Sequence, residues 1–326
     1  MIDIHQTGMS HSYFLLKKPQ NMSKKVLVTG AYGFIGRNVA RRFSNAGWTV
    51  VGIGHGAWRN EEFLKWGISE WYTSDITTDS LQAYSGYPEV IVHCAGSGSV
   101  GYSIDNPYQD FQRTVDTTVS VLEFVRRHAP QARVVYPSSA GVYGVAEKLP
   151  ISESAPLNPA SPYGVHKKIS EEMCISYARH FGVTVTIVRL FSVYGNGLRK
   201  QLLWDACVKV DKGENMFSGS GLEIRDWLHV NDAALLLLKE GMQATTDCKI
   251  VNGGSGKGVT IRDFLYQLFF CFGRADIPQF SGTIRNGDPA HYTADISALS
   301  DSGWQPNISW QEGVREYVEW FRGGAQ

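Results

Sequence analysis

The sequence predicts an α/β fold with a doubly wound parallel sheet and a smaller lobe that is interleaved with it. Short apolar, β-branched runs alternate with longer helical stretches, as in parallel strands joined by crossover helices. A glycine-rich turn joins the first of these runs to the first helical stretch. The strands are expected near residues 25–29, 49–53, 90–94, 133–136 and 184–190.

Helices are clearest where apolar residues recur at helical spacing. They are expected at residues 34–46, 107–128, 162–181, 231–243, 260–272 and 310–322. Glycines and turn signals become more frequent in residues 191–225 and 254–326, which predicts the smaller lobe there. The larger domain is expected to comprise residues 23–190 and 226–253, after a poorly ordered extension of residues 1–22.

The composition argues against several classes of partner. Lysine plus arginine equals aspartate plus glutamate at 31 each, so neither nucleic acid nor an anionic membrane is expected as a partner. Five scattered cysteines show no metal-ligand spacing, and we expect no metal site. Their odd number favours a reduced cytoplasmic location over a disulfide framework. The first 22 residues lack the basic region and apolar stretch of a signal peptide.

The first expected strand, Lys25–Thr29, leads directly into a glycine-rich loop and then a helix. Strand, glycine loop and helix in that order indicate a dinucleotide site of the Rossmann type. The glycines allow backbone N–H groups to approach a pyrophosphate at the helix N-terminus, where the helix dipole favours negative charge. A tight turn without a ligand is the alternative. The candidate cofactor residues here are Gly30, Gly33, Phe34, Ile35 and Gly36.

The second expected strand is followed by Gly54, where an NAD site usually has an acid that binds the ribose 2′-hydroxyl. His55 and Arg59 lie nearby as further candidate cofactor residues. Without the carboxylate there is no repulsion against a 2′-phosphate, and Arg59 can pair with one. NADP is therefore an option beside NAD, unless Arg59 merely faces solvent as most charged loop residues do.

Tyr163 and Lys167 lie four residues apart in a stretch expected to be helical, which places both side chains on one face. A phenol titrates near pH 10, but a fixed cation beside it favours the phenolate. Lowering its pKa by about three units takes roughly 4 kcal/mol, which an ammonium and a cofactor's positive ring could supply together. The pair is therefore a candidate base and its activating cation.

Ser139 follows another apolar run, at residues 133–136, and lies 24 residues before Tyr163. A hydroxyl at the carboxyl end of a strand points into the crevice where open α/β sheets bind ligands. Ser-rich loops are often only turns. Together with the glycine loop and the Tyr163/Lys167 pair, however, Ser139 indicates a hydroxyl, a phenol and an ammonium around a nicotinamide.

From residue 23 onward the chain resembles the extended short-chain dehydrogenase/reductases, in the nucleotide-sugar epimerase/dehydratase branch typified by UDP-galactose 4-epimerase. The resemblance includes the glycine loop, Asp75-Ile76, His93-Cys-Ala-Gly96, Ser138-Ser-Ala-Gly-Val-Tyr-Gly144, Ser161-Pro-Tyr-Gly-Val-His-Lys167, Arg189-Leu-Phe-Ser-Val-Tyr-Gly195 and Arg225-Asp-Trp-Leu-His-Val230.

The resemblance implies an NAD(P)-dependent enzyme of nucleotide sugars. Tyr163 would exchange a proton with a sugar hydroxyl, Lys167 would bind the nicotinamide ribose, and Ser139 would hydrogen-bond the reacting oxygen. The further implied cofactor contacts are Asp75 and Ile76 at the adenine and Ala95 and Gly96 along the cofactor path. By analogy, helices 107–128 and 162–181 would pair across a homodimer.

For the substrate, the resemblance implies that Arg225 and Arg285 hold the diphosphate of a nucleotide sugar, because arginine can donate two hydrogen bonds to phosphate oxygens. A structural salt bridge is the rival interpretation of each arginine. Phe217 would lie against the base, and Ser192 stands where a phosphate-contacting Asn is common. Tyr292 would limit the pocket, favouring a plain hexose over an N-acetylated one, unless it is a packing residue.

Two departures from the family pattern bear on the reaction. Thr114 begins Thr-Val-Asp-Thr-Thr where the family commonly has Asn-Val-x-Gly-Thr. The 4,6-dehydratases usually carry Asp-Glu directly after the catalytic hydroxyl residue, whereas this chain has Ala140 and Gly141. Without a carboxyl pair nothing evident removes the C5 proton and protonates the departing hydroxyl, which argues against dehydration.

Three hypotheses follow. The leading one is a 4-epimerase that oxidises and reduces the sugar at C4. The second is an NADPH-dependent 4-keto-sugar reductase, which Gly54 and the missing Asn favour. The third, from another class, is a non-catalytic dinucleotide sensor or scaffold, although such proteins tend to lose the tyrosine or the lysine.

Overall fold

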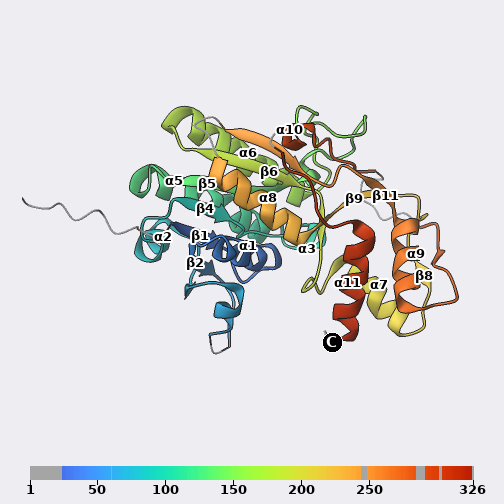
Figure 1. The fold of residues 1–326 in the computed structure, drawn as a ribbon. Helices are drawn as coiled ribbons and strands as arrows, with labels where there is room; N and C mark the ends of the chain where they lie inside the picture. The colour runs from blue at the N-terminus through green and yellow to red at the C-terminus, as the bar shows by residue number, and fades with distance from the viewer. Residues whose placement is uncertain (1–23, 60, 244–247, 284–290, 301–302, 325–326) are drawn as a thin grey trace, which may run out of the picture.

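A computed structural model of the protein describes residues 24–59, 61–243, 248–283, 291–300 and 303–324. Its centre is a parallel sheet of seven strands in the order β10-β6-β5-β4-β1-β2-β3 (Figure 1). The predicted α/β fold with a doubly wound parallel sheet is confirmed. The strands are β1 (Lys25–Thr29), β2 (Thr49–Gly54), β3 (Glu70–Thr73), β4 (Val90–His93), β5 (Arg133–Ser139), β6 (Val185–Leu190) and β10 (Lys249–Gly253).

Two helical layers cover the sheet because its strands are apolar on both faces. Helices α1 (Phe34–Asn45) and α8 (Val230–Gln243) pack on one face, with Phe43 and Leu236 in the core beneath them. The other face carries α2 (Thr78–Tyr84), α5 (Thr117–His128) and α6 (Pro162–Phe181). Shorter elements on this part of the chain are η1 (Glu62–Trp66), α3 (Val100–Asp105) and η3 (Ala140–Val142).

The expected helix at residues 107–128 is interrupted. It consists of α4 (Pro107–Phe111), a π-helical segment η2 (Gln112–Asp116) and then α5. Single π-helical turns inside helices occur often at functional sites. Here the irregular turn lies opposite α6, the helix that carries Tyr163 and Lys167.

A second group of elements lies at one end of the sheet (Figure 1). Strand β9 (Ile224–His229) pairs with β7 (Ser192–Tyr194) and β11 (Gly258–Thr260), so residues 226–229 lie in this small sheet and not in the large one. Helices α7 (Gln201–Asp211), α9 (Ile261–Phe272) and α11 (Trp310–Arg322) enclose an aromatic-rich core. The remaining elements are β8 (Met216–Phe217), β12 (Gln279–Phe280) and α10 (Ser297–Ser300).

The strand order reverses between β1 and β4, since β1 pairs with β2 on one side and β4 on the other. In open α/β sheets the ligand crevice lies outside the carboxyl ends of the strands at such a switch point. Gly30, Ala95 and Ser139 follow or end β1, β4 and β5. The topology therefore brings the glycine loop and the serine to one edge of the sheet.

Candidate active site

The glycine loop is held close to the neighbouring strand ends. Gly30 donates its N–H to the Ile53 carbonyl oxygen at 2.7 Å, and Ala95 donates its N–H to Thr29 Oγ1 at 3.2 Å. A Cβ on Gly30 would lie 2.7 Å from the Ala95 nitrogen, and Gly30 has a φ of +65°. Only glycine allows this close approach without displacing backbone.

The N-terminus of α1 is open to an anion. Its N-cap residue is Gly33, which has no side chain that could cap the helix. The N–H groups in the first turn of a helix have no partner within the helix. Phe34 and Ile35 occupy this turn, and a Cβ on Gly36 would lie 2.3 Å from the Gly30 carbonyl oxygen. Side chains at Gly30 or Gly36 would occupy the space that this loop leaves between backbone segments. Such a glycine cradle fits the pyrophosphate of a dinucleotide.

Two predicted cofactor residues, His55 and Asp75, meet beyond β2. His55 Nε2 lies 2.5 Å from Asp75 Oδ1, and both side chains are about three-quarters exposed. Ile76 is buried against the core, whereas the Arg59 side chain is exposed and its backbone N–H bonds Glu62. An acid therefore lies next to Gly54 in space, although the sequence places none there.

Helix α6 begins where local chemistry favours it. Ser161 is the N-cap and accepts from the Gly164 N–H at 3.3 Å, Pro162 is the first helical residue, and the left-handed Gly182 ends the helix. Tyr163 lies in the first turn, and its backbone N–H donates to Ser103 Oγ at 3.0 Å. This bond holds the backbone of Tyr163 in the first turn of α6.

The Tyr163 ring lies against Gly141, where an added Cβ would be 3.6 Å from two ring carbons and 3.3 Å from Ser139 Oγ. Burial raises the pKa of Tyr163, its hydrogen bond with Ser139 lowers it, and the charge of Asp110 raises it. The net direction is upward, opposite to the depression expected from Lys167. Burial is the largest of these effects.

Lys167 is buried one turn after the tyrosine. Its Nζ donates to the Pro137 carbonyl oxygen at 3.0 Å and lies 4.7 Å from the centre of the Tyr136 ring. Burial lowers the pKa of Lys167 to about 8. The structure therefore brings Ser139, Tyr163 and Lys167 together at the ends of β5 and α6.

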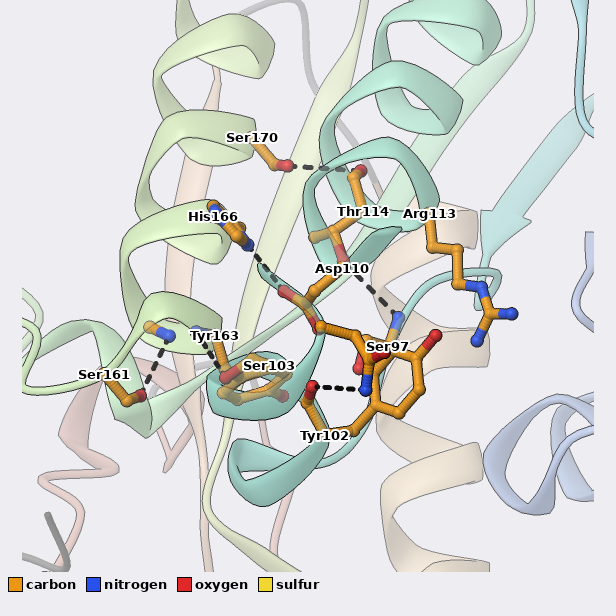
Figure 2. A network of polar contacts seen from close by, with 12 residues as sticks. Ser97, Tyr102, Ser103, Asp110, Arg113, Thr114, Ser161, Tyr163, His166 and Ser170 are labelled. Carbon is orange, nitrogen blue, oxygen red and sulfur yellow. Dashed lines mark hydrogen bonds and ion pairs between the residues drawn. The ribbon is translucent and has the colours of Figure 1, made fainter. Parts of the chain in front are cut away.

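The face of α6 turned toward α3, α4 and η2 is lined by polar contacts (Figure 2). His166 Nδ1 lies 2.5 Å from Asp110 Oδ2, and both residues are buried. Ser170 Oγ donates to the Thr114 carbonyl oxygen at 3.3 Å, and Thr114 Oγ1 accepts from the Ser97 N–H at 3.4 Å. Thr114, at the position of the family's usual Asn, thus links η2 to the loop after β4.

A buried ion pair between β6 and α6 lies next to the residues of the site. Arg189 on β6 makes three hydrogen bonds of 2.7–3.1 Å to the carboxylate of Glu171 on α6. Ser138 Oγ donates to the same carboxylate at 2.5 Å. Tyr143 receives a bond from Arg189 and donates to Asn252 at 2.6 Å. This network joins three strands, α6 and the loop after Ser139.

Three of the predicted substrate residues, Ser192, Phe217 and Arg225, lie in the second group of elements. Ser192 begins β7, and Arg225 lies in β9, half-buried, with Nη1 donating to the Ile224 carbonyl oxygen at 2.9 Å. Phe217 is 5% exposed and packs against Phe269 and Phe280, so core side chains cover its ring. Arg285 lies outside the described residues.

Tyr292 is buried beside the loop that follows Ser139. Its hydroxyl donates to the Gly144 carbonyl oxygen at 2.9 Å, and its ring packs edge-on against Phe191. Tyr292 thus holds the loop after Ser139 through its bond to Gly144. Gly96 is exposed and Ala95 half-buried after β4, as a path for a ligand requires.

Sequence analysis missed Asp110, His166, Thr29 and His93. His166 lies inside the motif that identified Tyr163, but its partner is 56 residues away and carries no local signal. Thr29 Oγ1 lies 2.7 Å from His93 Nδ1, and burial lowers the pKa of His93 to about 3. Both pairs form only when the strands and helices meet.

Among the described residues no cluster of His, Cys, Asp and Glu could hold a metal ion. Within the same residues no helix combines the length and apolar character that crossing a membrane requires.

Comparison with known proteins identifies relatives along almost the whole chain. Residues 26–246 match the model of the NAD dependent epimerase/dehydratase family. A putative UDP-glucose 4-epimerase of Methanocaldococcus jannaschii is 29% identical, over 91% of this chain and 98% of that protein. A Thermotoga maritima UDP-glucose 4-epimerase, solved with UDP-glucose, has a TM-score of 0.83 and 26% identity, over 93% of this chain and all of that one. A Thermus thermophilus UDP-glucose 4-epimerase, solved with NAD, has a TM-score of 0.82 and 25% identity, over 92% and 100%.

Proposed function

The chain belongs to the NAD-dependent epimerase/dehydratase family, and on that premise we propose that it is a nucleotide-sugar 4-epimerase. The observation that carries the proposal is the convergence of Ser139, Tyr163 and Lys167 beside a glycine cradle. A hydroxyl, a phenol and an ammonium placed close together suit proton exchange at a sugar hydroxyl next to a nicotinamide. UDP-sugars, with which relatives in the family have been solved, are the first substrates to test.

The protein's part in the reaction is proton transfer and positioning. Tyr163 takes the proton of the C4 hydroxyl and later returns it, while the Ser139 hydroxyl holds the reacting oxygen. Lys167 binds the nicotinamide ribose. A bound nicotinamide would supply reversible hydride transfer at C4, next to the oxygen that Tyr163 and Ser139 hold. No net oxidation results, so a retained cofactor suffices.

The loop after Ser139 supports epimerisation over dehydration. Ala140 and Gly141 occupy the positions of the dehydratase acids. A Cβ on Gly141 would already lie 3.3 Å from Ser139 Oγ, so a glutamate there would crowd the serine and the tyrosine ring. Neither Ala140 nor Gly141 supplies the carboxylic acid that dehydration requires.

We propose that NAD, and not NADP, is the preferred cofactor. Gly54 and Arg59 favour NADP by themselves, but the Asp75 carboxylate lies 2.5 Å from His55 at the end of β2. A 2′-phosphate near this carboxylate would be repelled. Measuring the binding of NAD and NADP by titration calorimetry tests this preference directly.

The second candidate is a 4-keto-sugar reductase, which the missing Asn at Thr114 and the missing acid at Gly54 favour. The two differ in stoichiometry, because a reductase consumes one reduced cofactor per turnover. The third hypothesis, a non-catalytic sensor, has less support because Tyr163 and Lys167 are both present and close to Ser139.

For the substrate, we propose that Arg225 and Arg285 bind the diphosphate, that Ser192 lies near it, and that Tyr292 limits the sugar pocket. We also propose a homodimer through α4, α5 and α6. Large apolar side chains on α4 and α6 face solvent, among them Tyr108 at 72%, Phe181 at 54% and Val165 at 40% exposure. Burying such side chains between two copies would be favourable.

The decisive experiment is to incubate the purified protein with UDP-glucose, UDP-galactose and their uronic acids without added cofactor, and to separate the products by chromatography. We expect interconversion of one C4 pair, and loss of it in Tyr163→Phe. Interconversion that persists in Tyr163→Phe would refute the catalytic assignment. In a separate incubation with a nucleotide 4-keto sugar and NADPH, consumption of one NADPH per product would establish the reductase.

A further inference from the structure

Asp110 and His166 form a buried pair beside the proposed catalytic tyrosine (Figure 2). Asp110 on α4 is 0% exposed, and its Oδ2 lies 2.5 Å from His166 Nδ1 on α6. Its other oxygen, Oδ1, is buried without a hydrogen-bond partner among the described residues. An unpaired carboxylate oxygen away from water is costly, so this arrangement calls for a reason beyond packing.

The pair is the middle one of three polar links between α6 and the segment opposite it. The Tyr163 N–H bonds Ser103 on α3, His166 pairs with Asp110, and the Ser170 hydroxyl bonds the Thr114 carbonyl of η2. Residues 163, 166 and 170 are three and four apart, so they lie on one helical face. The three links fix the rotation of α6 about its axis, and with it the direction of the phenol.

The pair also places a charge near the phenol. The groups that bear on Tyr163 are Asp110 from α4 and, from β5, Ser139 and the buried Tyr136. Asp110 acts against ionisation of Tyr163 and favours the charged form of Lys167. Of the other charged groups near these helices, Arg113 is exposed and lies over the Tyr102 ring, 5.1 Å away.

We propose that Asp110 and His166 are positioning residues for the reaction, which orient Tyr163 through α6 and hold the Asp110 carboxylate in place against that helix. This inference rests on the proposed role of Tyr163 as acid and base. His166 holds the carboxylate in place through its Nδ1 atom. The edge of Phe111 packs on the imidazole, with ring centres 5.5 Å apart, and keeps the pair dry.

The test uses Asp110→Asn, which removes the charge but keeps the size of the side chain. The phenol is titrated in the NAD-bound protein as the tyrosinate absorbance that is lost in Tyr163→Phe. We expect the midpoint to fall by about one pH unit, and the midpoint of the kcat/KM profile to fall with it. Asp116→Asn is the matched control, because that residue lies exposed on the adjoining η2 and should leave both midpoints unchanged.

A second pair of variants separates the orientation of Tyr163 from the effect of the Asp110 charge. His166→Gln keeps a donor toward Asp110 and should retain at least about tenfold more activity than His166→Leu. If Asp110→Asn does not fold, the double variant Asp110→Asn/His166→Gln restores an uncharged hydrogen-bonded pair and should show the same downward shift.

An unchanged phenol midpoint in a folded Asp110→Asn or double variant overturns the proposal. Because the absorbance titration needs no sugar, it distinguishes this result from a wrong substrate assignment. A shifted midpoint in a protein that turns over no nucleotide sugar would leave the pair's role standing and refute only the proposed reaction.

Discussion

The Lys167 ammonium lies 3.0 Å from the carbonyl oxygen of Pro137, two residues before Ser139. This bond ties α6 directly to the end of β5, so the cation and the serine hydroxyl cannot move independently. The pKa of Tyr163 is nevertheless raised, because burial is the largest effect on it. The ammonium donates to the backbone of β5.

Lys167 makes the protein's behaviour depend on pH near 8. Burial lowers its pKa from 10.5 to about 8, so the folded protein loses this proton before the unfolded chain does. The unfolded chain therefore binds more protons between pH 8 and 10.5, and this residue's contribution to stability rises with pH across that window. NAD affinity should move in the opposite direction, because the ammonium that binds the ribose is lost above pH 8.

Fluorescence titration of NAD between pH 7 and 9.5 tests the second half of this prediction. Lys167→Met, which cannot titrate, is the control and should bind NAD weakly with little dependence on pH in this range. A wild-type affinity that stays constant across the range would contradict the assignment of Lys167 to the cofactor.

Gly36→Ala should abolish most NAD binding. Its new Cβ would lie 2.3 Å from the Gly30 carbonyl oxygen, so the glycine loop must shift away from the position that cradles a pyrophosphate. We expect a loss of at least about tenfold in NAD affinity by calorimetry. Gly273→Ala is the control, since it strains a left-handed residue at the end of α9 by roughly 1 kcal/mol without touching the loop. Equal NAD affinity in the two variants would argue against the cradle.

Arg189→Met should destabilise the protein strongly. It leaves the Glu171 carboxylate buried and without its three bonds from the guanidinium, and breaking such a pair typically costs about 3–5 kcal/mol. Urea unfolding followed by circular dichroism measures the change. Arg315→Met is the matched control at an exposed pair with Glu312 and should unfold close to the wild type. A small change in Arg189→Met would mean that Glu171 is neutralised by its surroundings.

Asp75→Ser should relax the preference against NADP. Removing the carboxylate that lies against His55 removes the negative charge nearest the expected 2′-phosphate, while Arg59 remains. We expect NADP affinity to rise by about tenfold relative to NAD, and the gain to shrink at high salt because the site is exposed. An unchanged ratio of NADP to NAD affinity would mean that the adenosine ribose does not bind next to Asp75.

The alternation of apolar runs and helical stretches was sufficient to predict the sheet and its main helices. Helices α6, α9 and α11 lie within one residue of their expected limits, because caps such as Ser161 and Gly182 are local signals. The glycine loop and the Tyr163/Lys167 spacing are equally local. Strand β10 and helix α7 were missed because each is short or lacks a strong periodic pattern.

The sequence by itself therefore determined which residues form the strands, the cradle and the tyrosine–lysine pair, since those depend on neighbours within a few positions. Tertiary structure alone decided that Asp75 stands beside His55, that Asp110 faces His166, and that Phe217 is covered by core rings. Each of these contacts joins segments about 20 or more residues apart, so no local pattern encodes it. It also decided the pKa direction of Tyr163, because burial depends on how the whole fold excludes water.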